Sequence, residues 1–153
     1  MASLSVDRLM ANWHFLPIHV RREFPCLNFD EYIWRVPKLE SSEAARLVVD
    51  AAANKKAANI VLLDIHELTI IADYFVICTG SNPKQLSAIA DAVDEEMHKI
   101  GRSYIRREGS EESGWILLDI EGEICCHIFN PEQREFYQLE RLWKVAPRLL
   151  YVD

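Results

Sequence analysis

The sequence predicts an α/β (α+β) domain with a mixed sheet of about five strands flanked by helices. Two amphipathic helix patterns begin near Ser41 and at Pro83, and short runs of branched apolar residues, which suit buried strands, follow them. The pair Glu121-Gly122 between two further apolar runs indicates a β-hairpin. Because a hairpin adds antiparallel pairing to strands that alternate with helices, the sheet is expected to be mixed.

An irregular extension is predicted to precede this domain. In residues 1–40, aromatic side chains are interspersed with prolines and follow no sustained period. Disordered tails are poor in aromatic residues, so we interpret this stretch as an N-terminal extension that packs on the domain or on a partner. The folded domain is expected to occupy residues 41–153.

The domain is expected to open with a helix followed by two strands. Ser41 or Ser42 is a suitable N-cap for the helix, and a pair of lysines stands near its end, where positive charge is favourable. Residues 60–65 and 74–79 are apolar and rich in branched side chains. Both stretches are therefore predicted to be buried strands.

A second helix is predicted after the turn Gly80-Ser81-Asn82-Pro83. Ser81 or Asn82 is expected to cap it, because both side chains can accept a hydrogen bond from the first turn. Pro83 suits that first turn, and Gly101 is a typical C-terminal stop.

Three strands and a last helix complete the predicted domain. The strands are expected at residues 103–107, 115–120 and 123–129, and Asn130-Pro131 opens a helix bounded by Pro147. The helix positions expected to face the core are Phe136, Leu139 and Trp143. Those expected to be more exposed are Arg134, Tyr137, Glu140 and Arg141.

The charge distribution favours a basic partner. The chain of 153 residues has a formal net charge of −7. Residues 1–40 carry five basic and five acidic side chains, so the acidic excess belongs to the domain. An acidic surface repels free nucleic acid and suits a basic protein, although acidity also serves solubility alone.

Cysteine usage and hydropathy bear on the compartment. The four cysteines form neither a CxxC pair nor a disulfide-dense pattern, which indicates a reducing compartment. Charges interrupt every apolar run, so no membrane span and no membrane partner are predicted. Residues 1–40 contain scattered acidic side chains and make a poor transit peptide. A cytoplasmic location is expected, with mitochondrion or plastid as the alternative.

One candidate for catalysis is Gly80-Ser81 followed by Asp91 and Asp94. Nucleotidyltransferases place a Gly-Ser turn before two carboxylates that hold magnesium and a triphosphate. Here the carboxylates are three residues apart on a helix instead of two apart on a strand, so a solvated helix face explains them. We expect no catalytic residue, no cofactor and no small-molecule substrate.

A second candidate combines Cys78, Cys125, Cys126 and His127, which are of the residue types that bind zinc. Adjacent residues of a strand point to opposite faces, so Cys125 and Cys126 cannot both join His127. A Cys125–His127 pair would share one face but lacks an evident orienting group. We interpret the thiols as small buried side chains and predict no metal site.

Two segments are candidates for binding a partner. Asp73-Tyr74 stands at a strand start, where Tyr74 is either an exposed anchor or packs at the sheet edge. Residues 108–123 contain six acidic side chains, no Lys or Arg, and Trp115. A rigid aromatic beside carboxylates is a plausible docking patch for a basic protein, although Trp115 also suits the core.

Several segments together resemble the ribosomal silencing factor family, RsfS or Iojap, from about Ser41 to Pro147. Their order and spacing are more specific than any one of them. The segments are 56–60, Leu63-Asp64, Ala72-Asp73-Tyr74-Phe75-Val76-Ile77, Gly80-Ser81 with Gln85, 88–91, Glu108-Gly109, Gly114-Trp115-Ile116-Leu117-Leu118-Asp119, His127-Ile128-Phe129 and 134–143.

The resemblance implies a fold like a nucleotidyltransferase core without its catalytic carboxylates. It implies binding to the large ribosomal subunit through the fourteenth ribosomal protein of the universal set, beside an intersubunit bridge. Bulk at that position would block subunit joining and repress translation. The resemblance also implies that the free protein can form a homodimer. The alternatives are a large-subunit assembly factor, as for organellar relatives, or a divergent nucleotidyltransferase.

Two features depart from the family pattern. Ile124-Cys125-Cys126 replaces the usual valines before His127, and residues 1–40 lie outside the family core. We expect the sheet edge and the acidic hairpin to dock on the basic partner, so that binding weakens with salt. The residues expected to form the docking patch are Asp73, Tyr74, Trp115, Asp119, His127 and Tyr137.

Overall fold

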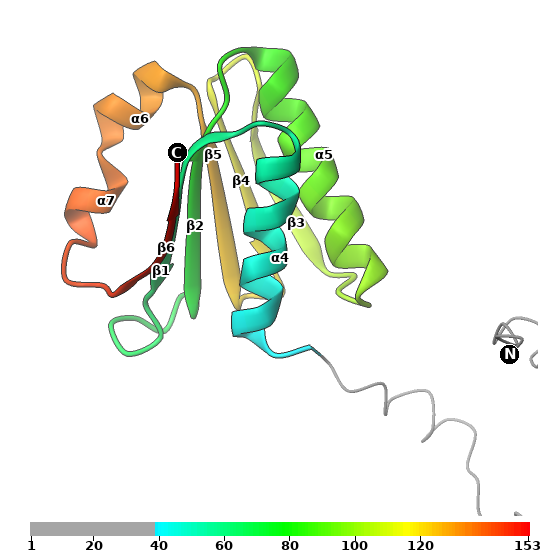
Figure 1. Ribbon diagram of the computed structural model, residues 1–153, viewed down its shortest axis with the longest axis vertical. Helices are drawn as coiled ribbons and strands as arrows, with labels where there is room; N and C mark the ends of the chain where they lie inside the picture. The colour runs from blue at the N-terminus through cyan, green and yellow to red at the C-terminus, as the bar shows by residue number, and fades with distance from the viewer. Residues whose placement is uncertain (1–38) are drawn as a thin grey trace, which may run out of the picture. The chain divides into compact units, whose positions relative to one another are not determined.

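A computed structural model describes residues 39–153, which fold as a six-stranded mixed sheet between two unequal helical layers (Figure 1). The helices are α4 (Ser41–Asn54), α5 (Pro83–Lys99), α6 (Pro131–Tyr137) and α7 (Leu139–Leu142). The strands are β1 (Ala58–Asp64), β2 (Tyr74–Thr79), β3 (Ile105–Ser110), β4 (Trp115–Ile120), β5 (Ile124–Phe129) and β6 (Arg148–Val152). Residues 1–38 lie outside this description, so the predicted extension is covered only at Leu39 and Glu40.

The sheet is mixed, as predicted. Its strand order is β3-β4-β5-β2-β1-β6, and every neighbouring pair is antiparallel except β2 and β5. The parallel pair forms because α5, β3 and β4 intervene between these strands in the chain and return it to the same end. Both parallel strands therefore terminate at the same end of the sheet, where α5 and α6 begin.

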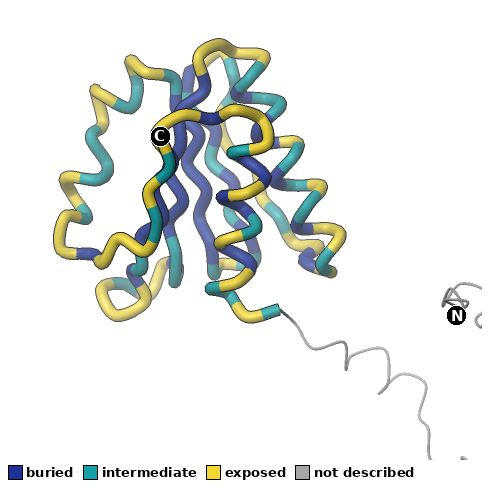
Figure 2. Tube along the Cα trace, viewed as in Figure 1, coloured by how far each residue is buried: buried dark blue, intermediate teal, exposed yellow. Residues whose placement is uncertain are grey.

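Each sheet face has its own core, because side chains alternate along every strand (Figure 2). The larger core lies under α4 and α5, whose buried side chains recur at helical spacing. The smaller core lies on the opposite face, where α6, α7 and the following turn cover only part of the sheet. Cys126 belongs to the first core and Cys125 to the second, which confirms that these neighbours point to opposite faces.

Several predicted boundaries are confirmed. The second and fourth strands span the predicted residues. Asn82 caps α5, because its Oδ1 accepts the Gln85 backbone N–H at 2.9 Å. Gly101 follows the end of that helix with a φ of 82°. The prediction that Ser41 or Ser42 caps the first helix is wrong, since Glu40 occupies that position and no side chain caps it.

The C-terminal part differs most from the prediction. The single expected helix is two short helices, because Gln138 takes a left-handed conformation with a φ of 44°. This break turns Phe136 outward, to 78% exposure, so the prediction that it faces the core is wrong. Leu139 and Trp143 pack on the second core as predicted. A sixth strand, β6, was not predicted and pairs with β1.

In the described part of the chain, no helix is both long enough and apolar enough to cross a membrane.

Candidate functional site

The sheet face under α6 and α7 carries a cluster of aromatic rings. We call this set the aromatic cluster, and its members are Phe75, Trp115, His127, Phe129, Tyr137 and Trp143. Trp115 contributes the central ring: its centroid lies 4.8 Å from that of Tyr137 and 4.9 Å from that of Phe129. Because the rings come from β2, β4, β5, α6 and the turn after α7, the cluster exists only in the folded domain.

His127 lies at the base of the cluster. Its ring is 5.9 Å from Trp115 and 4.9 Å from Phe75, and the residue is buried. Burial lowers the pKa of His127 to about 4, against a smaller opposing effect of Glu140. The imidazole is therefore neutral at pH 7, so it contributes ring surface and no positive charge.

The cluster reaches the surface at Tyr137, which is 44% exposed. Phe136 lies next to it, with ring centroids 5.0 Å apart. A cavity of about 230 Å³ opens between Trp115, Tyr137 and the strand residues Glu108 and Leu117. The exposed end of the cluster therefore offers aromatic surface beside a carboxylate.

Trp115 is positioned by two glycines. Gly109 and Gly114 have φ values of 79° and 76°, which residues with a side chain rarely adopt. A Cβ atom on Gly109 would lie 2.1 Å from the Trp115 carbonyl oxygen. One on Gly114 would lie 2.2 Å from Asn130 Nδ2, the side chain that caps α6. The glycine at each position lets the chain approach closely, so β4 packs directly against β3 at Gly109 and against the start of α6 at Gly114.

Asp119 lies on the same face of β4, two residues beyond Leu117. Its Oδ1 accepts the Gly122 backbone N–H at 3.0 Å, so this carboxylate also stabilises the hairpin turn. Arg106 lies nearby, with Nη2 at 3.9 Å from Asp119 Oδ2. Asp119 thus lies at the rim of the face that carries Trp115, His127 and Tyr137 rather than among their rings.

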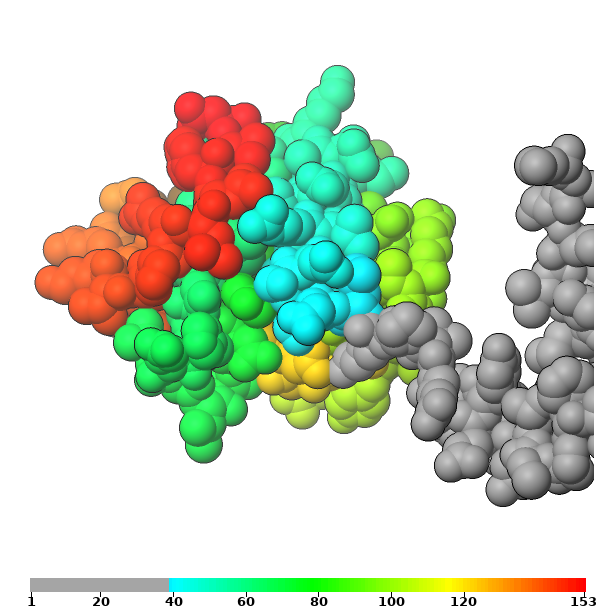
Figure 3. All heavy atoms as spheres, turned by 60° about the horizontal axis from the view of Figure 1, so that its bottom comes forward, coloured from blue at the N-terminus to red at the C-terminus, as the bar shows by residue number. Residues whose placement is uncertain are grey.

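The other two predicted docking residues lie elsewhere. Asp73 precedes β2, and its backbone pairs with Ile65 and Glu123. Tyr74 opens the strand, is partly buried and packs on the core under α4, the opposite face from Trp115. Desolvation and nearby carboxylates raise the pKa of its phenol. Figure 3 shows this end of the molecule, where the β1–β2 loop lies beside the hairpin tip.

Residues 108–123 contain no Lys or Arg, but the fold places positive charge from outside the segment beside them. Arginines within and just before β3 lie beside these acids, and the pairing of β3 with β4 sets Arg106 opposite Asp119. Arg106 Nε lies 3.0 Å from Glu108 Oε1. The buried Arg102 pairs with Glu121 at 3.1 Å and with Glu123 at 2.7 Å. Arginines that precede the acidic segment thus neutralise much of its charge.

The residues considered for catalysis do not meet in one site. Asp91 accepts a hydrogen bond from Arg107 Nη1 at 2.8 Å, whereas the Ser81 hydroxyl donates to Gln85 at 2.8 Å. Asp94 is on the same helix as His98, whose ring nitrogen contacts the Asp94 carbonyl oxygen. The cysteines also separate, because Cys78 and Cys126 lie in the first core while Cys125 and His127 lie on the second face.

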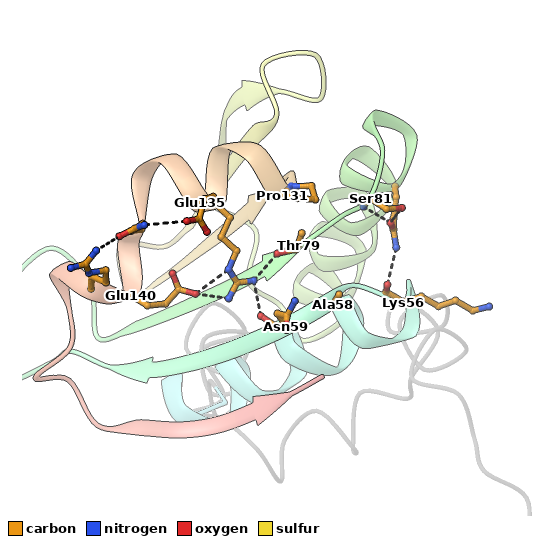
Figure 4. A pocket seen from close by; sticks show the side chains of 12 residues that line it. Lys56, Ala58, Asn59, Thr79, Ser81, Pro131, Glu135 and Glu140 are labelled. Atoms are coloured by element: carbon orange, nitrogen blue, oxygen red, sulfur yellow. Dashed lines mark hydrogen bonds and ion pairs between the residues drawn. The ribbon is translucent and has the colours of Figure 1, made fainter.

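A second hollow, the polar groove, lies where β2 and β5 end (Figure 4). Its volume is about 690 Å³. Arg134 crosses its floor: Nη1 donates to the Asn59 carbonyl and to Thr79 Oγ1, both at 2.7 Å, and Nε donates to Glu140 at 3.0 Å. The expectation that Arg134 is exposed is therefore wrong, since it ties α6 to β1, β2 and α7.

Three residues that line the groove have a left-handed backbone conformation. Lys56, Asn59 and Gln138, all on its lining, have φ values of 58°, 50° and 44°. Among residues 39–153, the only other non-glycine with a positive φ is Glu121 in the hairpin. Such conformations cost free energy and persist where surrounding contacts hold them, often at functional sites.

The sequence did not place Phe75, Phe129 and Trp143 with the docking residues, although it did predict that Trp143 faces the core. The available signal was strand alternation, because Phe129 lies two residues beyond His127 and must share its face. The parallel pairing that sets Phe75 opposite Cys125 joins distant segments and has no local signal.

Comparison with known proteins identifies the family. Residues 38–153 match the family described as "Ribosomal silencing factor during starvation", RsfS. The ribosomal silencing factor RsfS of Halalkalibacterium halodurans is 37% identical over 109 residues, which cover 71% of this chain and 92% of that protein. A crystal structure of a protein from Chromobacterium violaceum superposes with a TM-score of 0.66 at 28% identity, covering 75% of this chain and 94% of that one.

A mitochondrial relative is also similar. A Mus musculus protein named for mitochondrial assembly of the ribosomal large subunit is 31% identical over 100 residues, which cover 63% of this chain and 43% of that protein. The family match spans the whole described domain, and the solved bacterial structure has the same fold. This chain therefore belongs to the RsfS (Iojap) family of ribosomal silencing factors.

Proposed function

We propose that the chain docks on the large ribosomal subunit through the exposed end of the aromatic cluster and sterically blocks subunit joining. The partner is a basic protein at the intersubunit face, the fourteenth of the universal set. Occupancy and bulk would then suffice to repress translation. Silencing of this kind needs no chemical step, so the chain acts by binding.

The observation that carries this proposal is the surface formed by Trp115 and Tyr137. Aromatic side chains dominate binding energy at protein interfaces when they are rigid and partly desolvated. Trp115 is held by β3, α6 and its neighbouring rings, so little side-chain freedom remains to be lost on binding. Tyr137 adds exposed ring surface and a hydroxyl.

The acids at the rim suit a basic partner. Glu108 lines the cavity beside Trp115, and Asp119 lies further along β4. Both lie near Arg106, which is more than half exposed and can move aside for a partner's cation. Rim charges mainly govern the association rate and register, whereas aromatic anchors govern dissociation.

The test measures binding and subunit joining with matched variants. Trp115→Ala and Tyr137→Ala should each weaken binding to purified large subunits by at least about tenfold, as expected for interface anchors. Tyr104→Ala is the control, because Tyr104 is also an exposed aromatic but immediately precedes β3 and is not a member of the aromatic cluster. Equal affinities for all three variants would contradict the proposed docking face.

A second candidate function is large-subunit assembly, which the name of the Mus musculus relative favours. The same docking surface would serve both functions, so variants of the surface do not separate them. The distribution of the protein across ribosomal particles does. A silencing factor is expected on mature large subunits, whereas an assembly factor is expected on immature ones only.

A further inference from the structure

Two neighbouring segments of this acidic protein contain lysines and no acidic residue of their own. The net charge of the chain is −7, yet residues 54–63 and 78–90 contain three lysines and no acidic residue. The lysines are Lys55, Lys56 and Lys84, and we call them the lysine edge. All three are exposed, and none forms an ion pair with a carboxylate in residues 39–153.

The fold brings these two segments together through Gln85. Its Nε2 donates to the carbonyl oxygens of Lys55 at 3.0 Å and Lys56 at 2.8 Å. Its Oε1 accepts the Ser81 backbone N–H at 2.7 Å and the Ser81 hydroxyl at 2.8 Å. One side chain thus fixes the end of α4 against the start of α5, so the lysine edge has a rigid backbone.

The lysine edge continues into the polar groove. Lys56 and Ser81 lie on the rim of the groove (Figure 4). Arg141 also lines the groove. Glu135, Glu140 and Asp153 also border this region, and Glu140 is engaged by Arg134. Glu111 and Glu132 line a separate hollow beside Ser81, so the positive charge lies at the three lysines and not along the whole rim.

Helix α6 separates this region from the proposed docking face. Tyr137 points to the aromatic cluster, whereas Arg134 on the same helix points into the polar groove. A partner surface that reaches across α6 would meet both. Basic ribosomal proteins are embedded in RNA, so a chain docked on one has phosphates beside it.

We propose that the lysine edge and the adjoining groove rim bind the phosphate backbone of ribosomal RNA next to the docked protein. This inference rests on the proposed function. Lysine ammonium groups neutralise phosphates and release counterions, which gives binding a measurable salt dependence. Ser81 and Asn59 add neutral hydrogen-bonding groups at the rim. The acidic remainder of the domain would restrict RNA contact to this edge.

The test compares salt dependence in two triple variants. Lys55→Gln, Lys56→Gln and Lys84→Gln are combined in one protein. The control combines Arg46→Gln, Lys99→Gln and Arg148→Gln, which change the net charge equally at exposed positions elsewhere. Binding to purified large subunits is measured between about 50 and 200 mM salt, the range over which phosphate contacts are strongly screened. Binding to the isolated ribosomal protein is measured in parallel.

The lysine variant should lower the slope of log affinity against log salt by about 2 to 3, roughly one per lost phosphate contact. Its affinity for the isolated protein should be unchanged, and the control should behave like the wild type. An unchanged slope overturns the RNA inference, as does an equal loss of affinity for the isolated protein. Failure of the docking proposal is distinct, because Trp115→Ala would then leave subunit binding unaffected.

Discussion

The protonation state of His127 depends on its burial in the aromatic cluster. The imidazole is enclosed by the rings of Phe75, Trp115 and Phe129, which disfavour the charged form. Its pKa of about 4 lies below the ordinary value of 6.5. The unfolded chain therefore takes up a proton between pH 6.5 and 4 that the folded domain does not.

This proton uptake makes stability depend on pH. Because the unfolded state binds more protons in this window, stability is full above pH 6.5 and decreases as the pH falls toward 4. The loss attributable to His127 is about 3 kcal/mol. His127→Phe keeps a ring in the cluster and should lose less stability over the same window in urea unfolding curves. If the free energy of unfolding fell equally with pH in both proteins, the pH dependence could not be assigned to His127.

At the scale of single residues, the sequence indicated which residues belong to the site better than it indicated which face each side chain occupies. The sequence predicts Trp115, His127 and Tyr137 as docking residues, and the structure brings their rings together. Tyr74 is predicted with them, but its side chain lies on the opposite face of the sheet. Side chains alternate along a strand, so its face depends on where β2 begins. The burial of Arg134 had no sequence signal, because its four hydrogen bonds go to three acceptors that come from β1, β2 and α7.

At the scale of elements, the strand β4 depends on the glycines that flank it. Gly114 and Gly122 both have positive φ, at 76° and 72°, but only Gly114 has close neighbours. Nothing lies within 4 Å of a Cβ on Gly122, whereas a Cβ on Gly114 would strike the Asn130 side chain. Alanine at Gly122 would therefore cause backbone strain alone, whereas alanine at Gly114 would cause backbone strain and steric crowding.

Gly114→Ala should destabilise the domain more than Gly122→Ala does. Both substitutions incur the cost of a left-handed alanine, about 1 kcal/mol. Gly114→Ala adds the displacement of the α6 cap, which should cost a further 1 to 3 kcal/mol, roughly as for overpacking. Denaturant unfolding of the two variants measures the difference. Equal losses would show that Asn130 moves away without cost.

Arg102 joins three elements at the hairpin end of the sheet. It is buried, its Nη2 donates to the Leu39 carbonyl at 2.9 Å, and its Nη1 contacts Glu121 and Glu123. Glu123 also accepts a hydrogen bond from the Ser41 hydroxyl. The start of α4 is thereby attached to the β4–β5 hairpin, and the two lie side by side in Figure 3.

Arg102→Gln should lower the free energy of unfolding by about 2 to 4 kcal/mol, because it removes hydrogen bonds that the buried guanidinium donates to the Leu39 carbonyl and to two carboxylates. Lys99→Gln is the control: Lys99 pairs with Glu95 and Glu96 at the surface and should contribute less than about 1 kcal/mol. Thermal or urea unfolding gives both values. A loss for Arg102→Gln as small as that for the control would exclude the proposed attachment.

The elements themselves were largely predictable, for physical reasons. The runs that became β2 and β4 are apolar, of strand length and bounded by turn residues, so local pattern sufficed. The break at Gln138 was missed because glutamine does not signal a left-handed conformation. Strand β6 was missed because it is short and largely exposed, and its partner β1 lies some ninety positions earlier in the chain.

At the scale of the whole molecule, the proposed binding uses two surfaces separated by α6. The aromatic cluster offers uncharged, preorganised contact area, and the lysine edge offers positive charge on an acidic protein. The net charge of −7 suggested only a protein partner, because summed charge hides the segregation of lysines that the fold produces. The family membership supports the ribosome as the place where both surfaces would be used.

The most direct test of the account is sedimentation of large subunits with the purified chain, followed by addition of small subunits. Wild-type protein should co-sediment with the large subunit and reduce the joined-ribosome peak. Trp115→Ala should do neither at the same concentration, whereas Tyr104→Ala should do both. A joined-ribosome peak that stays undiminished while the wild-type chain occupies the large subunit would contradict steric silencing.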